Sequence, residues 1–206
     1  MATTPVKKAE ETPKKRDAAS EIYDVLELVA LCAAIIILIY TFAIRMTVVN
    51  QHSMEQTLIE GDYMLVSDMF YTPKTGDIVV VQNPSLTEHA EPLVKRVIAV
   101  GGDTLNINYT SWRVTLTHNG EKTILEEDYM YLDPTKSLVH ADWYDKIEAD
   151  GSYTYNIPEG YIFVMGDNRH VSADSRLAEV GLVPEPCVVG RVFMRVFPLS
   201  KIGWVD

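Results

Sequence analysis

A lysine inside an apolar run is the first residue in the sequence that could do chemistry. Lys95 lies in a stretch predicted to be a β-strand, and alternate residues of a strand share a face, so it shares its face with Leu93, Val97 and Ala99. Loss of hydration there disfavours the charged amine and lowers its pKa, and a neutral amine can take a proton from a serine hydroxyl. The alternative is a lysine whose ammonium group reaches the surface.

Ser53 could supply that hydroxyl. It lies between a predicted strand and the segment Glu55–Leu58, at a predicted turn. A nucleophile at a turn exposes its hydroxyl and leaves neighbouring backbone N–H groups able to bind an oxyanion. The alternative is a hydroxyl that only caps the turn.

A third segment, residues 166–176, reads GDNRHVSADSR and has neither a strand period nor a helix period. Six of its eleven residues are Asp, Asn, Ser or Gly, and two are Arg. Asp–Arg pairs and hydroxyl groups at this density can hold catalytic side chains in place through charge-assisted hydrogen bonds. A polar surface loop is the alternative.

Short strands are expected to position these residues, because β-branched and aromatic residues recur in short runs between Gly-Asp, Asn-Gly and Pro turns. This pattern predicts a mainly β fold, either a sandwich or a barrel-like core. Of the two we expect a barrel-like antiparallel β domain, formed by residues 45–105 and 159–206, as the catalytic domain. The more polar residues 106–158 predict a β-rich insertion. Residues 192–197 are mostly apolar on both faces, which predicts a buried strand. The predicted strands include Asp62–Ser67, Asp77–Gln82, Leu93–Val100, Trp112–Thr117, Tyr161–Met165 and Val188–Phe197.

The most apolar part of the chain precedes these strands. Residues 28–44 contain no charge, proline or glycine, and residues 25–44 are together long enough to cross a ~30 Å hydrocarbon core as a helix. We therefore expect one transmembrane signal-anchor helix at 25–44. The alternatives are a buried core helix and a cleavable signal peptide, but no clear Ala-x-Ala site follows the run.

Lysine and arginine near the ends of this span predict its orientation. Five of them precede it, whereas Arg45 alone follows it until Lys74. This asymmetry predicts a single-pass type II protein of the cell membrane, with its N-terminus in the cytoplasm and its catalytic domain outside. Residues 1–24, rich in Lys, Glu, Thr and Pro, are expected to form a disordered cytoplasmic tail.

Composition excludes other classes of function. The 206 residues carry 18 Lys and Arg against 29 Asp and Glu, a net charge of −11, so nucleic acid is not an expected partner. Cys32 and Cys187 are the only cysteines, too few for a disulfide framework or a cysteine-rich zinc site. Cys32 would lie in the bilayer and Cys187 outside it, so the two are not expected to pair.

Taken together, the segments resemble the motifs of bacterial type I signal peptidases, membrane-anchored serine proteases with a Ser-Lys dyad. Residues 53–58 match the motif Ser-Met-x-Pro-Thr-Leu except that Gln56 replaces proline, which we expect to loosen the turn. Residues 76–80 match Gly-Asp-Ile-Val-Val, and residues 95–103 match Lys-Arg-Val-x-Ala-x-x-Gly-Asp. Residues 166–176 match Gly-Asp-Asn-Arg-x-x-Ser-x-Asp-Ser-Arg at every defined position.

The resemblance implies roles for individual residues. Ser53 would be the nucleophile and Lys95 the general base, as in the bacterial branch; the eukaryotic and archaeal branch has His in place of Lys. Ser172 would hydrogen-bond and orient the lysine. The oxyanion would be bound by the Ser53 backbone N–H and by the amide of Gln51, which stands two residues upstream, where some family members have a serine or threonine hydroxyl. The supporting residues would be Asp174, Arg176, Asp167 and Asn168. No metal or cofactor is needed.

The implied function is removal of N-terminal signal peptides from secreted preproteins, with cleavage after small-x-small sequences. Expected partners are secretory preproteins and the lipid bilayer, with the enzyme monomeric in the membrane.

Three alternatives remain at this point. One is an inactive anchored relative that only binds preproteins. Another is a sortase-type transpeptidase, for which His118, Cys187 and Arg195 occur in the right order, although Cys187 lacks the Thr-Leu-x-Thr-Cys pattern. The third is a self-cleaving repressor-type Ser-Lys protease, which would carry a DNA-binding domain and no anchor.

Overall fold

The computed structural model describes residues 18–42, 44–82, 92–133 and 147–205. The chain divides into two compact units, Met1–Tyr40 and Thr41–Asp206. The first contains almost all of helix α1 (Ala18–Phe42), and the second contains every strand. The predicted insertion lies partly outside the description, since residues 134–146 are not described.

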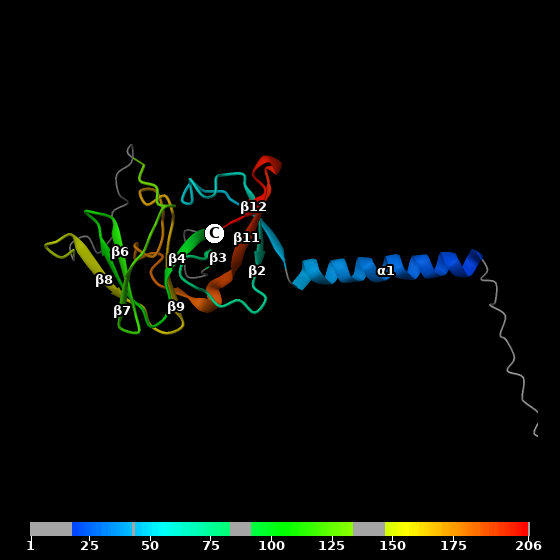
Figure 1. Cartoon of the computed structure of the whole chain (residues 1–206), viewed down its shortest axis with the longest axis horizontal. Helices are drawn as coiled ribbons and strands as arrows, with labels where there is room; N and C mark the ends of the chain where they lie inside the picture. Colours follow the sequence, from blue (N-terminus) through cyan, green and yellow to red (C-terminus); the bar gives the residue numbers. More distant parts are fainter. Residues whose placement is uncertain (1–17, 43, 83–91, 134–146, 206) are drawn as a thin grey trace, which may run out of the picture. The chain divides into compact units, whose positions relative to one another are not determined.

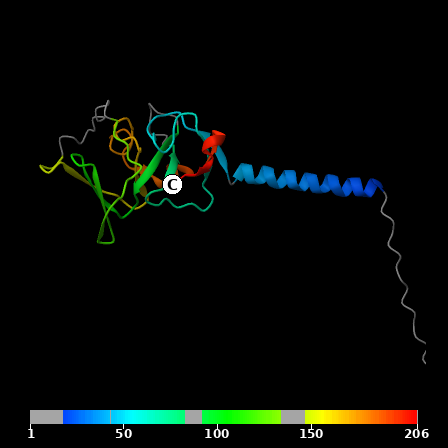
Figure 2. The same cartoon turned by 45° about the horizontal axis from the view of Figure 1, so that its top comes forward.

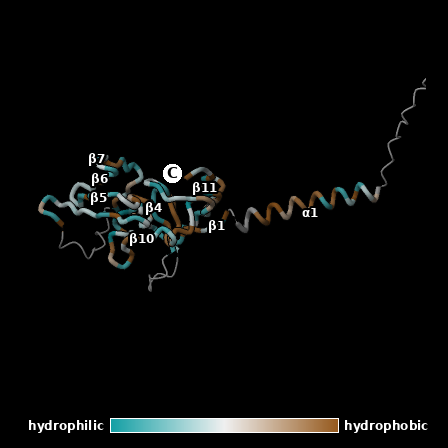
Figure 3. Tube along the Cα trace, turned by 90° about the horizontal axis from the view of Figure 1, so that it is seen from below, coloured by the Kyte–Doolittle hydropathy of each residue, from teal (hydrophilic) through white to brown (hydrophobic). Residues whose placement is uncertain are grey.

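Helix α1 begins within the predicted tail, so the expectation that residues 18–24 are disordered is wrong. Ala18 and Ala19 are strong helix formers, and Glu21 in the first turn favours the positive end of the helix dipole. Hydrophobic residues follow one another along the C-terminal part of α1 (Figure 3). Among the residues whose side chains the structure describes, none forms a helix long and apolar enough to cross a membrane. The side chains of residues 39–43, part of the predicted span, lie outside that description.

Among the described residues, the main sheet of the second unit has eight strands, and every neighbouring pair is antiparallel. Figure 1 labels β2, β3, β4, β9, β11 and β12 of this sheet. Its order is β1-β2-β11-β3-β4-β9-β10, and β12 pairs with β11. Within the described residues β1 and β10 do not pair with each other, so the predicted barrel-like sheet is open rather than closed. The strands are β1 (Arg45–Val48), β2 (Tyr63–Ser67), β3 (Ile78–Val81), β4 (Leu93–Ala99), β9 (Tyr161–Met165), β10 (Val183–Pro184), β11 (Val188–Phe197) and β12 (Gly203–Trp204).

A second antiparallel sheet, with four strands in the part of the chain that the structure describes, lies beside the main one in both views (Figure 1, Figure 2). Its order is β7-β6-β5-β8. It occupies the predicted insertion but begins two residues before position 106, because β5 continues directly from the turn after β4. Its strands are β5 (Thr104–Asn108), β6 (Arg113–His118), β7 (Glu121–Ile124) and β8 (Ser152–Asn156).

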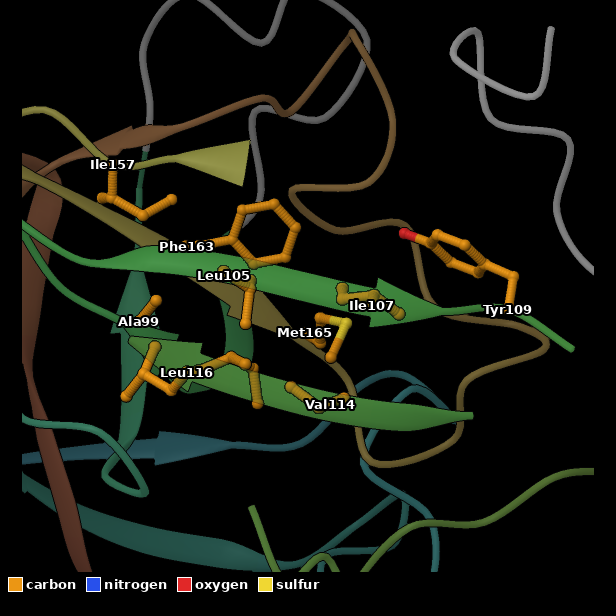
Figure 4. Close-up of a cluster of buried hydrophobic side chains, with 10 residues drawn as sticks. Ala99, Leu105, Ile107, Tyr109, Val114, Leu116, Ile157, Phe163 and Met165 are labelled. Atoms are coloured by element: carbon orange, nitrogen blue, oxygen red, sulfur yellow. The ribbon is translucent and has the colours of Figure 1, made fainter. Parts of the chain in front are cut away.

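One apolar cluster joins the two sheets (Figure 4). Ala99, Phe163 and Met165 come from the main sheet, and Leu105 and Ile107 come from the second sheet; all five are fully buried. Burial of this much apolar surface makes the two sheets one structural unit. Strands β4 and β9 form the main-sheet side of the cluster. Strand β4 also contains Lys95, and β9 leads directly into residues 166–176.

All six predicted strands are confirmed to within a residue or two. The expectation that 192–197 is a buried strand is wrong, because Val192 is buried but Phe197 is 51% exposed. Aromatic side chains here pack on neighbours at the surface rather than in a core: Phe193 lies against Trp204, and Phe197 lies edge-on to Tyr63. Two short 3-10 helices, η2 (Glu185–Cys187) and η3 (Leu199–Lys201), flank β11.

Candidate active site

Ser53 lies in a turn that the chain closes at its base. The Val49 N–H donates to the Asp62 carbonyl, and the Gly61 N–H donates to the Val49 carbonyl, each at 2.9 Å. Met54 and Leu58 are fully buried in the apolar cluster beneath β2 and β3. These contacts fix a turn that the sequence places between two strands, and they leave Ser53 6% exposed.

Lys95 lies at the middle of β4, between β3 and β9, and is fully buried. Its ammonium group therefore does not reach the surface, which removes the alternative raised by the sequence. The Lys95 Nζ donates a hydrogen bond to the Ser53 Oγ at 2.7 Å. The two residues are 42 positions apart in the chain, and the fold brings their reactive atoms into contact.

Burial lowers the pKa of Lys95 from 10.5 to about 8. Two nearby carboxylates act against this: Asp174, and more weakly Asp167, raise the pKa, while Arg176 lowers it. At neutral pH a usable fraction of the lysine is then the neutral amine that a general base requires.

The segment 166–176 is buried over most of its length rather than a surface loop. The Gly166 N–H donates to the Ser172 Oγ at 3.1 Å and to the Asp174 Oδ2 at 3.0 Å. The Arg176 guanidinium grips both oxygens of Asp174, at 2.8 and 2.9 Å. Burial raises the pKa of Asp174, but the charge of Arg176 and hydrogen bonds from Ser172 and Gly166 outweigh it and hold the pKa below its usual range.

A glycine is required at position 166 because there is no room for a side chain. A Cβ there would lie 2.4 Å from both the Ser172 Oγ and the Ser53 carbonyl oxygen. Gly166 therefore lies directly between the Ser53 carbonyl and the Ser172 hydroxyl. The predicted hydrogen bond between Ser172 and Lys95 stays a prediction.

Asp167 and Asn168 connect the segment to the Ser53 turn. The Asn168 N–H donates to the Ser53 carbonyl at 2.9 Å, and its side-chain amide donates to Glu55 at 3.0 Å. Asp167 accepts a hydrogen bond from the Thr57 hydroxyl and a bidentate pair from Arg96, with both Arg96 contacts at 2.9 Å. Asn168 thus contacts Ser53 directly, whereas Asp167 contacts the Ser53 turn through Thr57 and strand β4 through Arg96.

A cavity of about 250 Å³ opens beside Ser53. It lies between residues 47–54 and the start of β4 at Pro92 and Val94, and Gln51 lines it. Most of its side chains are apolar, which suits small apolar groups of a ligand. Within the described residues, no group of three or more His, Cys, Asp or Glu side chains could hold a metal ion.

The residues of the sortase alternative have other roles in this fold. Arg195 donates to the Asp62 carboxylate at 2.9 Å and to the Thr57 carbonyl at 3.1 Å, so it supports the Ser53 turn. His118, the last residue of β6, pairs with Asp103. Cys187 packs beside an apolar cluster of β3, β4 and β9.

Sequence reasoning missed three residues that hold the site together: Arg96, Thr57 and Glu127. Arg96 cannot act as a base, because a guanidinium keeps its proton, but its partner Asp167 is a candidate from the sequence, and a buried Asp needs such a partner. Glu127 pairs with the fully buried Arg169. Its place in the acidic run 126–128 gives no signal that one of the three side chains is buried.

Known proteins resemble this chain over a region that includes the residues of the site. A family model described as signal peptidase, peptidase S26, matches residues 22–197, which include Ser53, Lys95 and the segment 166–176. The chain is 30% identical over 186 residues to a probable signal peptidase I-1 of Synechocystis sp., covering 86% of this chain and 83% of the relative. It is 31% identical over 193 residues to signal peptidase I P of Bacillus subtilis subsp. natto, covering 92% and 96%.

Among solved structures, a signal peptidase I from Enterococcus faecalis is 27% identical, with 59% of this chain and 97% of that chain covered and a TM-score of 0.39.

Gln56 replaces the proline of the motif, a change expected to loosen the turn that follows Ser53. The structure shows no such loosening. The turn is closed, because the N–H groups of Thr57 and Leu58 donate to the Met54 carbonyl at 3.1 and 2.8 Å. Gln56 itself has a φ of 84°, in the left-handed region. Proline is fixed near a φ of about −65° and cannot adopt this conformation.

Restoring the motif's proline should therefore damage this enzyme. We expect Gln56→Pro to lower the free energy of unfolding by about 1–3 kcal/mol and to reduce cleavage, because the turn must be rebuilt. Gln56→Gly should be as active as the original and more stable by up to about 1 kcal/mol, since glycine adopts a positive φ without strain. Gln56→Ala controls for loss of the side chain. Urea unfolding and preprotein cleavage measure both effects; a Pro variant equal to wild type in both would contradict this account.

Proposed function

Because the chain belongs to the signal peptidase family, peptidase S26, and is a serine peptidase that removes signal peptides, we propose that Ser53 and Lys95 are its nucleophile and general base. The observation that carries the proposal is the 2.7 Å hydrogen bond between the Lys95 Nζ and the Ser53 Oγ in a buried environment. An inactive relative that only binds preproteins is not favoured, because both groups are present and in contact.

The proposed reaction uses Lys95 twice. The neutral amine takes the Ser53 proton while the Ser53 Oγ attacks the carbonyl carbon before the scissile bond. The resulting ammonium gives its proton to the leaving amine. In the second half of the reaction the neutral amine takes a proton from a water molecule as this attacks the acyl-enzyme, and returns the proton to the Ser53 Oγ as that oxygen leaves. With a pKa of about 8, about one Lys95 in ten is neutral at pH 7, compared with about one in a few thousand for an ordinary lysine.

The oxyanion would be bound by the Ser53 N–H and the Gln51 amide. Gln51 supports this role by its place in the wall of the cavity beside Ser53. Donors that are held in position before the reaction stabilise the charge as it develops. Ser172 would orient Lys95, and the Asp174–Arg176 pair would hold Ser172.

The substrate would bind as an extended strand along this cavity. Main-chain pairing with an enzyme strand gives affinity without reading sequence, and alternate side chains enter pockets. The modest volume and apolar walls of the cavity support cleavage after small-x-small sequences. The substrates would be secretory preproteins.

We also propose that residues 25–44 anchor a monomeric enzyme in the cell membrane, with the N-terminus in the cytoplasm. The absence of charge in 28–44 and the five Lys and Arg residues before the span support this. Ser53 follows the end of the span by only nine residues, which would hold it close to the outer surface, where the cleavage site of a preprotein emerges.

The dyad is tested by cleavage of a preprotein with an Ala-x-Ala site in detergent. We expect Ser53→Ala and Lys95→Ala to fold but to lose activity by roughly 10³-fold or more, because removing either member of a cooperating pair disables it. Matched controls are Ser111→Ala and Lys122→Ala, which change exposed residues of the second sheet and its turn. Dyad variants that cleave as well as these controls would refute the assignment.

The anchor is tested by cell fractionation. The wild-type protein should stay with membranes after an alkaline carbonate wash, and protease added to the outer face should remove the part after Arg45. Replacing Ile36 and Ile37 by Lys should release part of the protein, because each charge in a hydrocarbon core costs about 3 kcal/mol. Ile124→Lys, in the exposed strand β7, is the control. Wild-type protein found in the wash would contradict the anchor.

A further inference from the structure

A strap from the second sheet crosses residues 166–176, here called the catalytic segment. The strap, residues Leu125–Tyr131, follows β7 directly. Its end pairs with the catalytic segment through two backbone hydrogen bonds: the Tyr131 N–H donates to the Asp167 carbonyl at 2.8 Å, and the Arg169 N–H donates to the Tyr131 carbonyl at 3.0 Å. A segment of the predicted insertion is thus built onto the loop that contacts Ser53.

Glu127 makes the central contact of the strap. Its carboxylate is 5% exposed and accepts from two nitrogens of Arg169, at 2.5 and 3.3 Å, while the Arg169 side chain is fully buried. The Tyr129 hydroxyl adds a hydrogen bond to the same carboxylate at 3.2 Å, and the Tyr129 ring lies 3.8 Å from the Arg96 guanidinium carbon. A buried guanidinium needs such a partner, because it cannot lose its charge.

Arg169 in turn holds both sides of the active site. Its Nε donates to the Gly166 carbonyl at 3.1 Å, and its own carbonyl accepts from Arg176 at 2.8 Å. Gly166 contacts Ser172 and Asp174 through its N–H, whereas Asn168, next to Arg169, holds the Ser53 carbonyl. A change in the position of Arg169 would therefore move the Ser53 turn and the groups around Lys95 together.

We propose that Glu127 is a positioning residue of the peptidase, which acts through Arg169 to keep Ser53 and Lys95 within hydrogen-bond distance of each other. The second sheet is then part of the catalytic apparatus. This inference rests on the proposed function of the Ser-Lys pair. The strap contributes no residue to the wall of the cavity beside Ser53, so Glu127 should affect the chemical step and not the binding of substrate.

The neighbouring Glu126 provides a matched control. It is exposed, it stands one position earlier, and Glu126→Gln removes the same charge. Comparison of Glu127→Gln with Glu126→Gln in the full-length enzyme therefore isolates the contact with Arg169 from the change in net charge. Glu127→Asp keeps the charge but shortens the side chain, and it should restore part of the activity.

The experiment measures kcat and KM for a preprotein peptide with an Ala-x-Ala site between pH 6 and 10, corrected for the folded fraction. For Glu127→Gln we expect kcat to fall about tenfold or more, with KM within about twofold of wild type. The acid limb of the kcat profile should move to higher pH, because a looser site hydrates Lys95 and returns its pKa toward the ordinary value. Glu126→Gln should match wild type in all three respects.

Two results would overturn the proposal. One is a Glu127→Gln enzyme with the kcat and acid limb of Glu126→Gln. The other is a fall in the uncorrected rate that disappears when kcat is corrected for the folded fraction, with the acid limb unmoved, which would make Glu127 only a stabilising residue. If Glu127→Gln does not fold, the kcat and the acid limb of Glu127→Asp decide in its place. Failure of the proposed function would look different, since activity would then survive Ser53→Ala.

Discussion

The 2.7 Å contact between the Lys95 Nζ, which is fully buried, and the Ser53 Oγ is the interaction on which the rest of the structure depends. A lysine in water is protonated at neutral pH and cannot accept a proton. Strand β4 solves this by running between β3 and β9, so that every residue from Lys95 to Ala99 is buried. The same burial disfavours the charged amine. It lowers the stability of the fold and makes the lysine a usable base.

Carboxylates near the lysine could undo this effect, and the arrangement of arginines limits it. Asp174 and Asp167 both favour the ammonium form of Lys95. Each is held by its own guanidinium, Asp174 by Arg176 and Asp167 by Arg96, through paired hydrogen bonds. Because each negative charge is paired with its own guanidinium, burial remains the dominant influence on the pKa of Lys95. The carboxylates can then serve as rigid hydrogen-bond acceptors for the backbone and hydroxyl groups of the site.

Much of this could be predicted from the sequence, and the remainder has a common reason. Alternation around Lys95 indicated a dry face of a strand, and the Gly-Asp-Asn-Arg segment indicated a hydrogen-bonded support; both depend on local patterns. The burial of Glu127 and the left-handed Gln56 do not, because each depends on what the chain brings from elsewhere or on how one turn closes. The partial exposure of 192–197 was missed because an apolar pattern does not show whether a second layer covers the strand. Helix formation at 18–24 was missed because charged residues obscured good helix formers.

The pKa of Lys95 tests the central claim most directly. Lysine labelled with ¹³C at Cε gives an NMR signal that shifts on deprotonation, and the Lys95 signal is the one missing from a spectrum of Lys95→Met. We expect a midpoint at about 8 in the folded, detergent-solubilised enzyme. A midpoint at the ordinary value near 10.5 would show that the lysine is hydrated and charged under working conditions, and would contradict its role as the base that activates Ser53.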